Sequence, residues 1–392
     1  MAFAIDSNWV VDFAWILGIA CTLASVSMIL FVLWFRRYVD AENRHEKLVN
    51  DRWQETLFEI VSADESPDAE NLPDDDFGAE SYSGKFKNDF DDEVLQQIPE
   101  KDSPYFLYTW NYIHESLRGN AKDRLNAFAK SRGAKEKALK LLRSRFIKHR
   151  LLALNTLGNL GEKSTYDRIS TFAAKRDPIV SVWAFRAMFR IRPRETLEKH
   201  LHLIAERADW SPAHVAKILK ECDVDLISEG LAKLCNEYRE KEISEKQFAY
   251  LVSYLRFAHQ RDAEPILRKL ISESSQMEVL ISCLRLVRSE DSLPSIRKLL
   301  IDERWQLRMF SIMAIERFGH SYDIELLKRS LDDKNWWVRY YAAQALLRMP
   351  DMTTDDVKKL SVMVETDFER DILLQVLAEA EFRCKTQSST AL

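Results

Sequence analysis

The stretch Lys334–Met349, KNWWVRYYAAQALLRM, decides the fold of this chain, because Glu303–Phe318, ERWQLRMFSIMAIERF, repeats its pattern. A shift of 31 residues places Trp305 on Trp336, Arg308 on Arg339, Phe310 on Tyr341, Ala314 on Ala345 and Ile315 on Leu346. Small residues recur where two helices would cross closely, and large apolar residues recur where helix layers would pack. A period near 31 that contains two helices predicts a solenoid of stacked helix pairs.

Earlier stretches extend the same pattern toward the N-terminus. In Ile147–Gly161, IKHRLLALNTLGNLG, the residues Arg150, Leu152, Ala153, Leu157 and Gly161 fall on Arg308, Phe310, Ser311, Ile315 and Gly319, and a shift of 31 places Trp183 on Leu152 and Ala184 on Ala153. From about Asp102 onward the apolar residues follow helical periodicity, and no alternating strand pattern interrupts it. Prolines fall where helices are expected to end, at Pro178, Pro193, Pro212, Pro265, Pro294 and Pro350. We therefore predict an all-α chain, with an α-solenoid of about nine helix pairs over 94–383 and a flexible tail over 384–392.

The motif V-R-x-x-A-A-x-A-L at Val338–Leu346 resembles the second helix of the short HEAT-like repeats in phycobilin lyases and many bacterial scaffold proteins. The resemblance is close over 334–349, looser over 147–161, 178–191 and 303–319, and weak over 211–290. It implies a right-handed stack of antiparallel helix pairs with a concave binding surface. It implies no particular chemistry by itself.

An uncharged stretch near the N-terminus predicts one transmembrane helix. Phe13–Phe35 is 23 residues long and rich in Ile, Leu, Val and aromatic residues. A helix of that length spans about 34 Å, which is enough for a hydrocarbon core of about 30 Å. A cleaved signal peptide would have basic residues before a shorter apolar stretch, whereas only Asp6 and Asp12 precede this one.

The charges around this stretch predict its orientation. No Lys or Arg precedes it, and Arg36, Arg37, Arg44, Lys47 and Arg52 follow it. The positive-inside tendency places residues 1–12 outside and residues 36–392 in the cytoplasm, at the inner membrane if the organism is bacterial. The five cysteines form no C-x-x-C pair, which is typical of reduced thiols in the cytoplasm.

Small residues form one face of the predicted span, at Ala14, Gly18, Cys21, Thr22 and Ser25. In lipid, small side chains allow two helices to approach closely. We therefore expect this face to pack against a helix of a membrane protein partner, with chance occurrence as the alternative.

Two segments with different compositions separate the span from the repeats. Residues 36–61 contain Leu48, Trp53, Leu57, Ile60 and Val61 among charges, which predicts a juxtamembrane amphipathic helix. Residues 64–93 carry twelve acids against Lys85 and Lys87, whereas residues 94–392 carry a net charge of +8. We therefore expect 62–93 to be an acidic disordered linker.

A basic segment, residues 118–150, carries a net charge of +10 in 33 residues. Its cations are Arg118, Lys122, Arg124, Lys130, Arg132, Lys135, Lys137, Lys140, Arg143, Arg145, Lys148 and Arg150. The candidate ligands are anionic lipid, the acidic linker, an acidic protein partner and nucleic acid, and an ordinary solvated surface is the alternative. Nucleic acid is disfavoured because the segment follows a membrane anchor and lacks interleaved stacking aromatics.

Aromatic residues gather at one position of the repeat, at Trp305, Trp336, Trp337, Tyr340 and Tyr341. Because Trp305 and Trp336 are one period apart, we expect them to pack between repeats. Trp337 and Tyr340 fall outside that register, so they are the candidates for contact with a partner.

Motifs of catalysis are missing from the sequence. It contains no Gly-rich phosphate loop and no G-x-S-x-G nucleophile elbow. His200 and His202 are expected on opposite faces of a helix, where they cannot share a metal. HEAT-like deoxyhypusine hydroxylases hold iron through several His-Glu pairs, and this chain has only His45-Glu46 and His114-Glu115. We expect no enzyme activity, no cofactor and no metal.

These features together predict a membrane-anchored HEAT-repeat scaffold or adaptor that mediates protein–protein interaction in a membrane complex. The resemblance suggests an accessory subunit of a bacterial envelope system, such as a polysaccharide-synthesising glycosyltransferase. The first alternative is a nucleic-acid-binding or repair protein that uses the basic segment 118–150. The second is a cryptic lyase-like enzyme.

Overall fold

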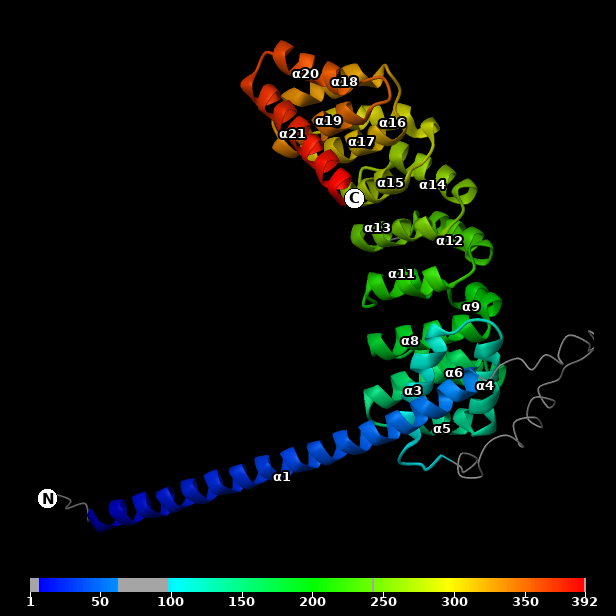
Figure 1. Ribbon diagram of the computed structural model, residues 1–392, viewed down its shortest axis with the longest axis vertical. Helices are drawn as coiled ribbons and strands as arrows, with labels where there is room; N and C mark the ends of the chain where they lie inside the picture. The colour runs from blue at the N-terminus through cyan, green and yellow to red at the C-terminus, as the bar shows by residue number, and fades with distance from the viewer. Residues whose placement is uncertain (1–6, 63–97, 242, 391–392) are drawn as a thin grey trace, which may run out of the picture. The chain divides into compact units, whose positions relative to one another are not determined.

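The computed structural model describes residues 7–62, 98–241 and 243–390, and every regular element in these ranges is a helix (Figure 1). The prediction of an all-α chain is therefore confirmed for the residues that the structure describes. The chain divides into two units, Met1–Ile169 (unit 1) and Ser170–Leu392 (unit 2).

Unit 1 begins with one unbroken helix. α1 contains 56 residues, which corresponds to a length of about 84 Å. It includes both the stretch expected to span a membrane and the juxtamembrane amphipathic helix expected to continue from it. The elements of this part of the chain are α1 (Ser7–Ser62), α3 (Ser103–Ser116), α4 (Asn120–Ser131), α5 (Ala134–Leu141), α6 (Ile147–Leu160), η2 (Lys163–Thr165) and α7 (Tyr166–Ala173).

The last part of α1 packs against α3 and α4. Leu57 and Ile60 are fully buried, and the ring of Trp53 meets that of Phe106 at 4.9 Å between centroids. His45 Nε2 lies 2.9 Å from Asp102 Oδ1. Burial of these apolar side chains attaches α1 directly to the first helices of the repeats. The expected acidic linker lies outside the described residues, except for Ser62 at the end of α1.

Unit 2 consists of helix pairs that stack in two layers (Figure 1). One layer contains α11, α13, α15, α17, α19 and α21, and the other contains α12, α14, α16, α18 and α20. The elements are α8 (Pro178–Ile191), α9 (Pro193–His200), α10 (Leu203–Glu206), α11 (Pro212–Glu221), α12 (Val224–Tyr238), α13 (Glu245–Ser253), η3 (Tyr254–Phe257), α14 (Gln260–Glu273), α15 (Met277–Leu286), η4 (Glu290–Ser292), α16 (Leu293–Lys298), η5 (Leu299–Ile301), α17 (Trp305–Phe318), α18 (Asp323–Arg329), η6 (Ser330–Asp332), α19 (Trp336–Arg348), α20 (Thr354–Met363) and α21 (Asp367–Thr390).

The prolines mark helix starts more often than helix ends. Pro178, Pro193 and Pro212 are the first residues of α8, α9 and α11, where the missing N–H has no intrahelical partner anyway. Pro265 differs, because it lies inside α14 rather than at a boundary. It is the sixth residue of that helix, so its missing N–H removes one backbone hydrogen bond near the start of the helix. The buried residues Leu267 and Leu270 hold the helix in the core.

One continuous apolar cluster runs through unit 2 from Val182 to Leu377. Ala314 and Ala345, which the 31-residue shift superimposes, are both fully buried at the contact between neighbouring helices. Large side chains at these positions would separate the layers, which explains the small residues in the repeat. α21 continues to Thr390, through residues that we expected to form a flexible tail.

Candidate interaction surfaces

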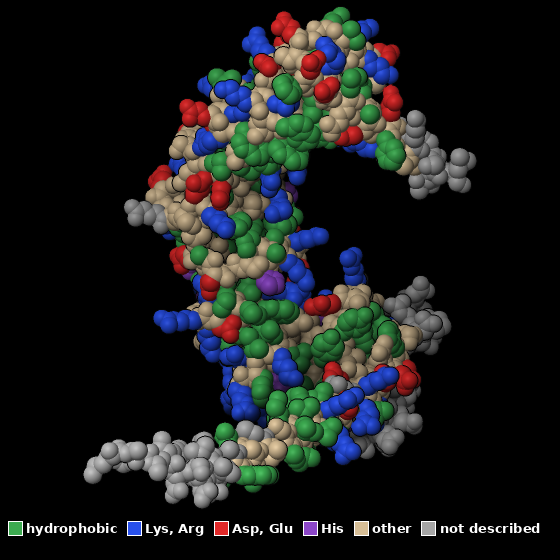
Figure 2. Space-filling model, turned by 90° about the vertical axis from the view of Figure 1, so that its left-hand side faces the viewer, with side chains coloured by type: hydrophobic (Ala, Val, Ile, Leu, Met, Phe, Trp, Pro, Cys, Tyr) green, Lys and Arg blue, Asp and Glu red, His purple; other side chains and the backbone are tan. Residues whose placement is uncertain are grey.

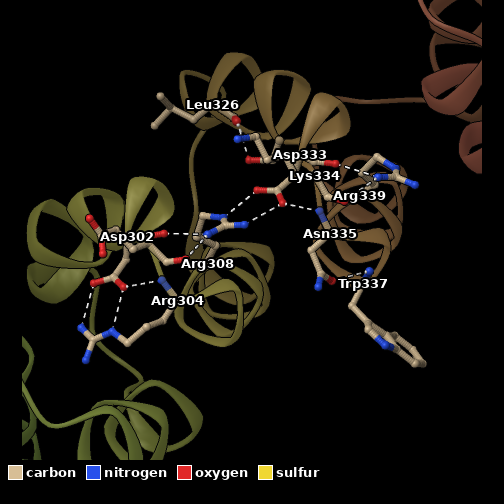
Figure 3. A network of polar contacts seen from close by, with 11 residues as sticks. Asp302, Arg304, Arg308, Leu326, Asp333, Lys334, Asn335, Trp337 and Arg339 are labelled. Atoms are coloured by element: carbon tan, nitrogen blue, oxygen red, sulfur yellow. Dashed lines mark hydrogen bonds and ion pairs between the residues drawn. The ribbon is translucent and has the colours of Figure 1, made fainter.

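The repeated arginine of the motif has a structural role (Figure 3). Arg308 Nη1 donates to the backbone carbonyls of Asp302 at 2.7 Å and Glu303 at 3.0 Å. Arg339, 31 residues later, donates in the same way to Asp333 at 2.7 Å and Lys334 at 3.3 Å. In each repeat the arginine therefore satisfies carbonyls in the turn that precedes its own helix.

An ion pair joins two successive repeats at the same place. Arg308 in α17 donates to both carboxylate oxygens of Asp333, at 2.6 and 2.7 Å, just before α19. Burial would raise the pKa of Asp333, but the hydrogen bond from Arg308 and that from the Asn335 backbone outweigh it, so this pKa lies below its usual value. Because Asp333 is already engaged inside the protein, this network is not a ligand site.

Four aromatic residues of α19, Trp336, Trp337, Tyr340 and Tyr341, form a cluster of rings that we call the aromatic cluster. Trp336 stacks on Tyr340 with 5.0 Å between centroids, and Trp337 meets Trp336 edge-on at 4.8 Å. Trp336 is 40% exposed and Trp337 is 47% exposed. Trp305, one period earlier, is instead half-buried against the core. The two tryptophans that the sequence superimposes therefore differ in exposure.

The ring of Trp337 extends away from the polar network and the neighbouring helices in Figure 3. Tyr340 is less available, because its hydroxyl donates to Glu379 Oε2 at 2.7 Å and accepts from Gln344 Nε2 at 2.7 Å. Burial, followed by the hydrogen bond to Glu379, raises the pKa of Tyr340. Of the two predicted contact residues, Trp337 is exposed, whereas the hydroxyl of Tyr340 joins α19 to α21.

Further apolar side chains lie exposed on the two helices that follow the aromatic cluster. They are Val362 and Met363 at the end of α20, and Phe368, Leu374 and Phe382 on α21. Phe368 is 70% exposed and lies 5.4 Å from the Arg339 guanidinium. These residues were not predicted from the sequence as contact residues, because a single apolar residue in a helical segment is expected in the core by default.

The basic segment divides into exposed and half-buried side chains. The exposed ones are Arg118, Lys130, Lys140, Arg143, Arg145 and Lys148, and the half-buried ones are Lys122, Arg124, Arg132, Lys135, Lys137 and Arg150. Arg124 donates to the carbonyl of Val61 at 2.7 Å, so it satisfies the C-terminal end of α1. The contact with α1 thus uses one of the cations that we expected to bind a ligand.

Other cations of the segment also bond within unit 1. Glu162 lies 3.2 Å from Lys135 and 3.7 Å from Lys130. Burial would raise the pKa of Glu162, but the hydrogen bond and charge of Lys135 outweigh this effect and lower it. Lys140 is hydrogen-bonded to Glu100, in the turn that precedes α3. The net positive charge available to a ligand is therefore smaller than the sequence suggests.

α1 is the helix of the described chain that is long and apolar enough to cross a membrane. Its side chains from Trp15 to Tyr38 are exposed wherever the structure describes them. In the predicted small-residue face, a Cβ at Gly18 would meet nothing within 4 Å, and Thr22 bonds back to the Ile19 carbonyl. Ser25 is exposed as well. The side chains of Ala14 and Cys21 lie outside the described ones.

In the described part of the chain, no set of three or more His, Cys, Asp or Glu side chains could hold a metal ion. Cys235 and Cys283 are buried, and burial raises the pKa of both thiols. A cavity of about 450 Å³ borders α8, α9, α11 and α12. Its arginines Arg186 and Arg190 are both bonded to Glu221.

Comparison with protein families identifies the repeats in unit 2. The family model of HEAT repeats matches residues 278–348 and 293–379, which include α15 to α20. The prediction of HEAT repeats is therefore confirmed for this part of the chain. No curated protein sequence matches the chain.

Comparison with solved structures matches an engineered protein, with 14% identity, a TM-score of 0.33, and 85% of this chain and 98% of that one covered. Kap121p is similar with 10% identity and a TM-score of 0.45, and the match covers 86% of this chain but only 45% of Kap121p. A designed armadillo repeat protein matches with 13% identity, a TM-score of 0.19, and 66% and 97% coverage.

Proposed function

We propose that this protein is a membrane-anchored adaptor, in which α1 crosses the membrane and the repeats bind a protein partner through α19 to α21. The observation behind the proposal is the exposure of Trp336 and Trp337 in the aromatic cluster, together with the exposed apolar residues of α20 and α21. Tryptophan and tyrosine are enriched among the residues that dominate binding energy at protein interfaces.

The anchor rests on the length and hydropathy of α1 and on the basic residues that follow its apolar stretch. We propose an N-terminus outside and repeats in the cytoplasm. The partner would then be a membrane protein or its soluble recruit. The sequence resemblance suggests an envelope glycosyltransferase assembly as the client and a bacterial inner membrane as the location.

Site-specific photo-crosslinking in the native cell tests the adaptor role. A photoreactive phenylalanine analogue at Trp337 should crosslink to one defined protein, and the same analogue at Tyr112 should not. Tyr112 is a suitable control because it is 68% exposed but lies on α3. Trp337→Ala should weaken that complex about tenfold or more, as expected for an interface hot spot. Equal crosslinking from both positions would contradict the proposal.

Fractionation tests the anchor separately. The full chain should remain with membranes after alkaline carbonate extraction and should be released by detergent. Recovery of the full chain in the soluble fraction without detergent would rule out the transmembrane assignment, whatever the crosslinking result.

A further inference from the structure

The turn between α5 and α6 brings apolar and basic side chains together on the surface of unit 1. Phe146 is 48% exposed and Ile147 is 39% exposed. Arg143, Arg145 and Lys148 beside them are exposed, and they have no ion-pair partner among the described residues. The Arg145 guanidinium lies 4.8 Å from the centre of the Phe146 ring. This turn therefore differs from an ordinary solvated basic surface, because it exposes two adjacent apolar side chains among its cations.

The contacts of α1 show which end of unit 1 is nearest to the apolar stretch. That stretch ends at Phe35, and His45, ten residues later, bonds to Asp102. Ten helical residues extend about 15 Å, of which lipid headgroups occupy about 5–7 Å. Glu100, two residues before Asp102, is bonded to Lys140 in the last turn of α5. The turn that follows Lys140 therefore lies near the end of unit 1 that is closest to the apolar stretch.

The C-terminal end of α1 has different neighbours. Arg124 bonds to the carbonyls of Ile60 and Val61, where α1 ends. The basic segment thus has two parts. The part on α4 is far from the apolar stretch of α1, and the part at the end of α5 and in the turn is near to it. Figure 2 views the molecule from the side toward which α1 projects, and hydrophobic and basic side chains intermingle there around the base of α1.

We propose that the turn 142–148 lies on the anionic surface of the membrane that holds α1, with Phe146 and Ile147 at the headgroup level. Arg143, Arg145 and Lys148 then lie beside acidic headgroups. This inference rests on the proposed function, because it requires α1 to be in the bilayer. Apolar insertion and cationic attraction are the two signals that together hold a segment at a membrane surface.

Two physical considerations favour lipid over nucleic acid as the occupant. Attraction between exposed charges falls off within about 8 Å at physiological salt, so the cations must be held close to the anionic surface. α1 supplies that proximity for a membrane. A duplex nucleic acid would contact the cations through its phosphates but would leave the Ile147 side chain in water.

Hydrogen exchange of the full chain in lipid nanodiscs tests this inference. The discs contain either phosphatidylcholine alone or phosphatidylcholine with phosphatidylserine, so α1 is inserted in both. Amide exchange over residues 140–150 should be slower with phosphatidylserine, by about fivefold for each engaged cation. The slowing should disappear at high salt and in the triple variant Arg143→Glu, Arg145→Glu and Lys148→Glu. Phe146→Ser should remove part of it.

The matched control is Lys217→Glu with Lys220→Glu on α11, two exposed cations that should leave exchange over 140–150 unchanged. Insertion into the discs is measured independently by flotation. A chain that does not float contradicts the anchor. A chain that inserts but exchanges equally in both kinds of disc overturns the assignment of the turn. The assignment is also overturned if inorganic phosphate reproduces the slowing in neutral discs, or if duplex DNA does so.

Discussion

Single arginine and aspartate residues show how the repeat pattern becomes a structure. Arg308 and Arg339 are superimposed by the 31-residue shift, and each bonds to the two carbonyls that lie six and five residues before it. Arg308 additionally binds Asp333 of the next repeat. In both repeats the arginine bonds to carbonyls that the turn before its helix leaves without partners. Its charge also connects neighbouring repeats where the next repeat has an acidic residue within reach, as Asp333 is for Arg308.

Asp333→Asn should destabilise the contact between α17 and α19. The side chains of Arg308 and Asp333 are only 15% and 12% exposed, so loss of the charge leaves a poorly solvated guanidinium. We expect the free energy of local opening to fall by about 1–3 kcal/mol at pH 7. Hydrogen exchange over both helices measures this change. Asp367→Asn is the control, because Asp367 is 87% exposed in its pair with Arg370 and should change little.

The effect of Asp333→Asn on stability should depend on pH. Because the folded-state pKa of Asp333 is lower than its usual value, the pair stabilises the protein at pH values above about 4. That stabilisation is lost as the pH falls through the folded-state pKa. The difference in exchange between the wild type and Asp333→Asn should therefore shrink below about pH 4. A difference that stays constant from pH 7 to pH 3 would show that the charge of Asp333 contributes nothing.

Individual helices in unit 2 depend on their neighbours rather than on their own propensity. α19 contacts α17 on one side and α21 on the other, and its fully buried residues include Ala342, Ala343 and Ala345. Such a helix is stable because its apolar side is covered from two directions. In a repeat array the stability is about the sum of such nearest-neighbour terms.

Ala345→Asp should therefore loosen the C-terminal repeats selectively. An unpaired charge at a fully buried position costs about several kcal/mol. We expect proteolysis to begin within α17 to α21, while protection of α8 to α13 is retained. Ala378→Asp on α21 is the matched control, since Ala378 is exposed. Protection lost evenly through unit 2 would instead indicate one cooperative core.

The chain as a whole combines an acidic segment with one long helix, α1. The first part of α1 is the predicted anchor, and its last part packs against the first helices of the repeats. Residues 64–93 carry a net charge of −10, whereas the whole chain carries a net charge of −5. The sequence predicts that this segment connects the membrane anchor to the repeats. The structure adds a second connection, because α1 is continuous and its last turns pack on α3 and α4.

Truncation should reveal this second connection. A chain of residues 94–392 lacks Trp53, Leu57 and Ile60, so the buried side chain of Phe106 would face water. A chain of residues 44–392 retains them. We expect the shorter chain to unfold at lower denaturant concentration in its first helices, and to aggregate more readily, because each large apolar side chain contributes about 1.5–3 kcal/mol on burial. Identical unfolding of the two chains would show that α1 does not stabilise α3 and α4.

The sequence by itself determined the features that depend on local spacing. Helical periodicity, the 31-residue repeat and the uncharged stretch Phe13–Phe35 can be recognised without any knowledge of distant contacts, because residue type and separation define them. The resemblance of Val338–Leu346 to HEAT-like repeats predicted the type of repeat, and the family match over 278–379 confirmed it for that part of the chain.

Only the tertiary structure decided how those elements use their side chains. Arg124 and Lys135 look like free cations in sequence, but one bonds to α1, 63 residues away along the chain, and the other lies beside Glu162. Trp305 and Trp336 are equivalent by spacing, yet one packs on the core and the other is exposed. Which neighbour covers a side chain depends on the packing of segments that are distant in sequence, and a periodic pattern contains no information about that packing.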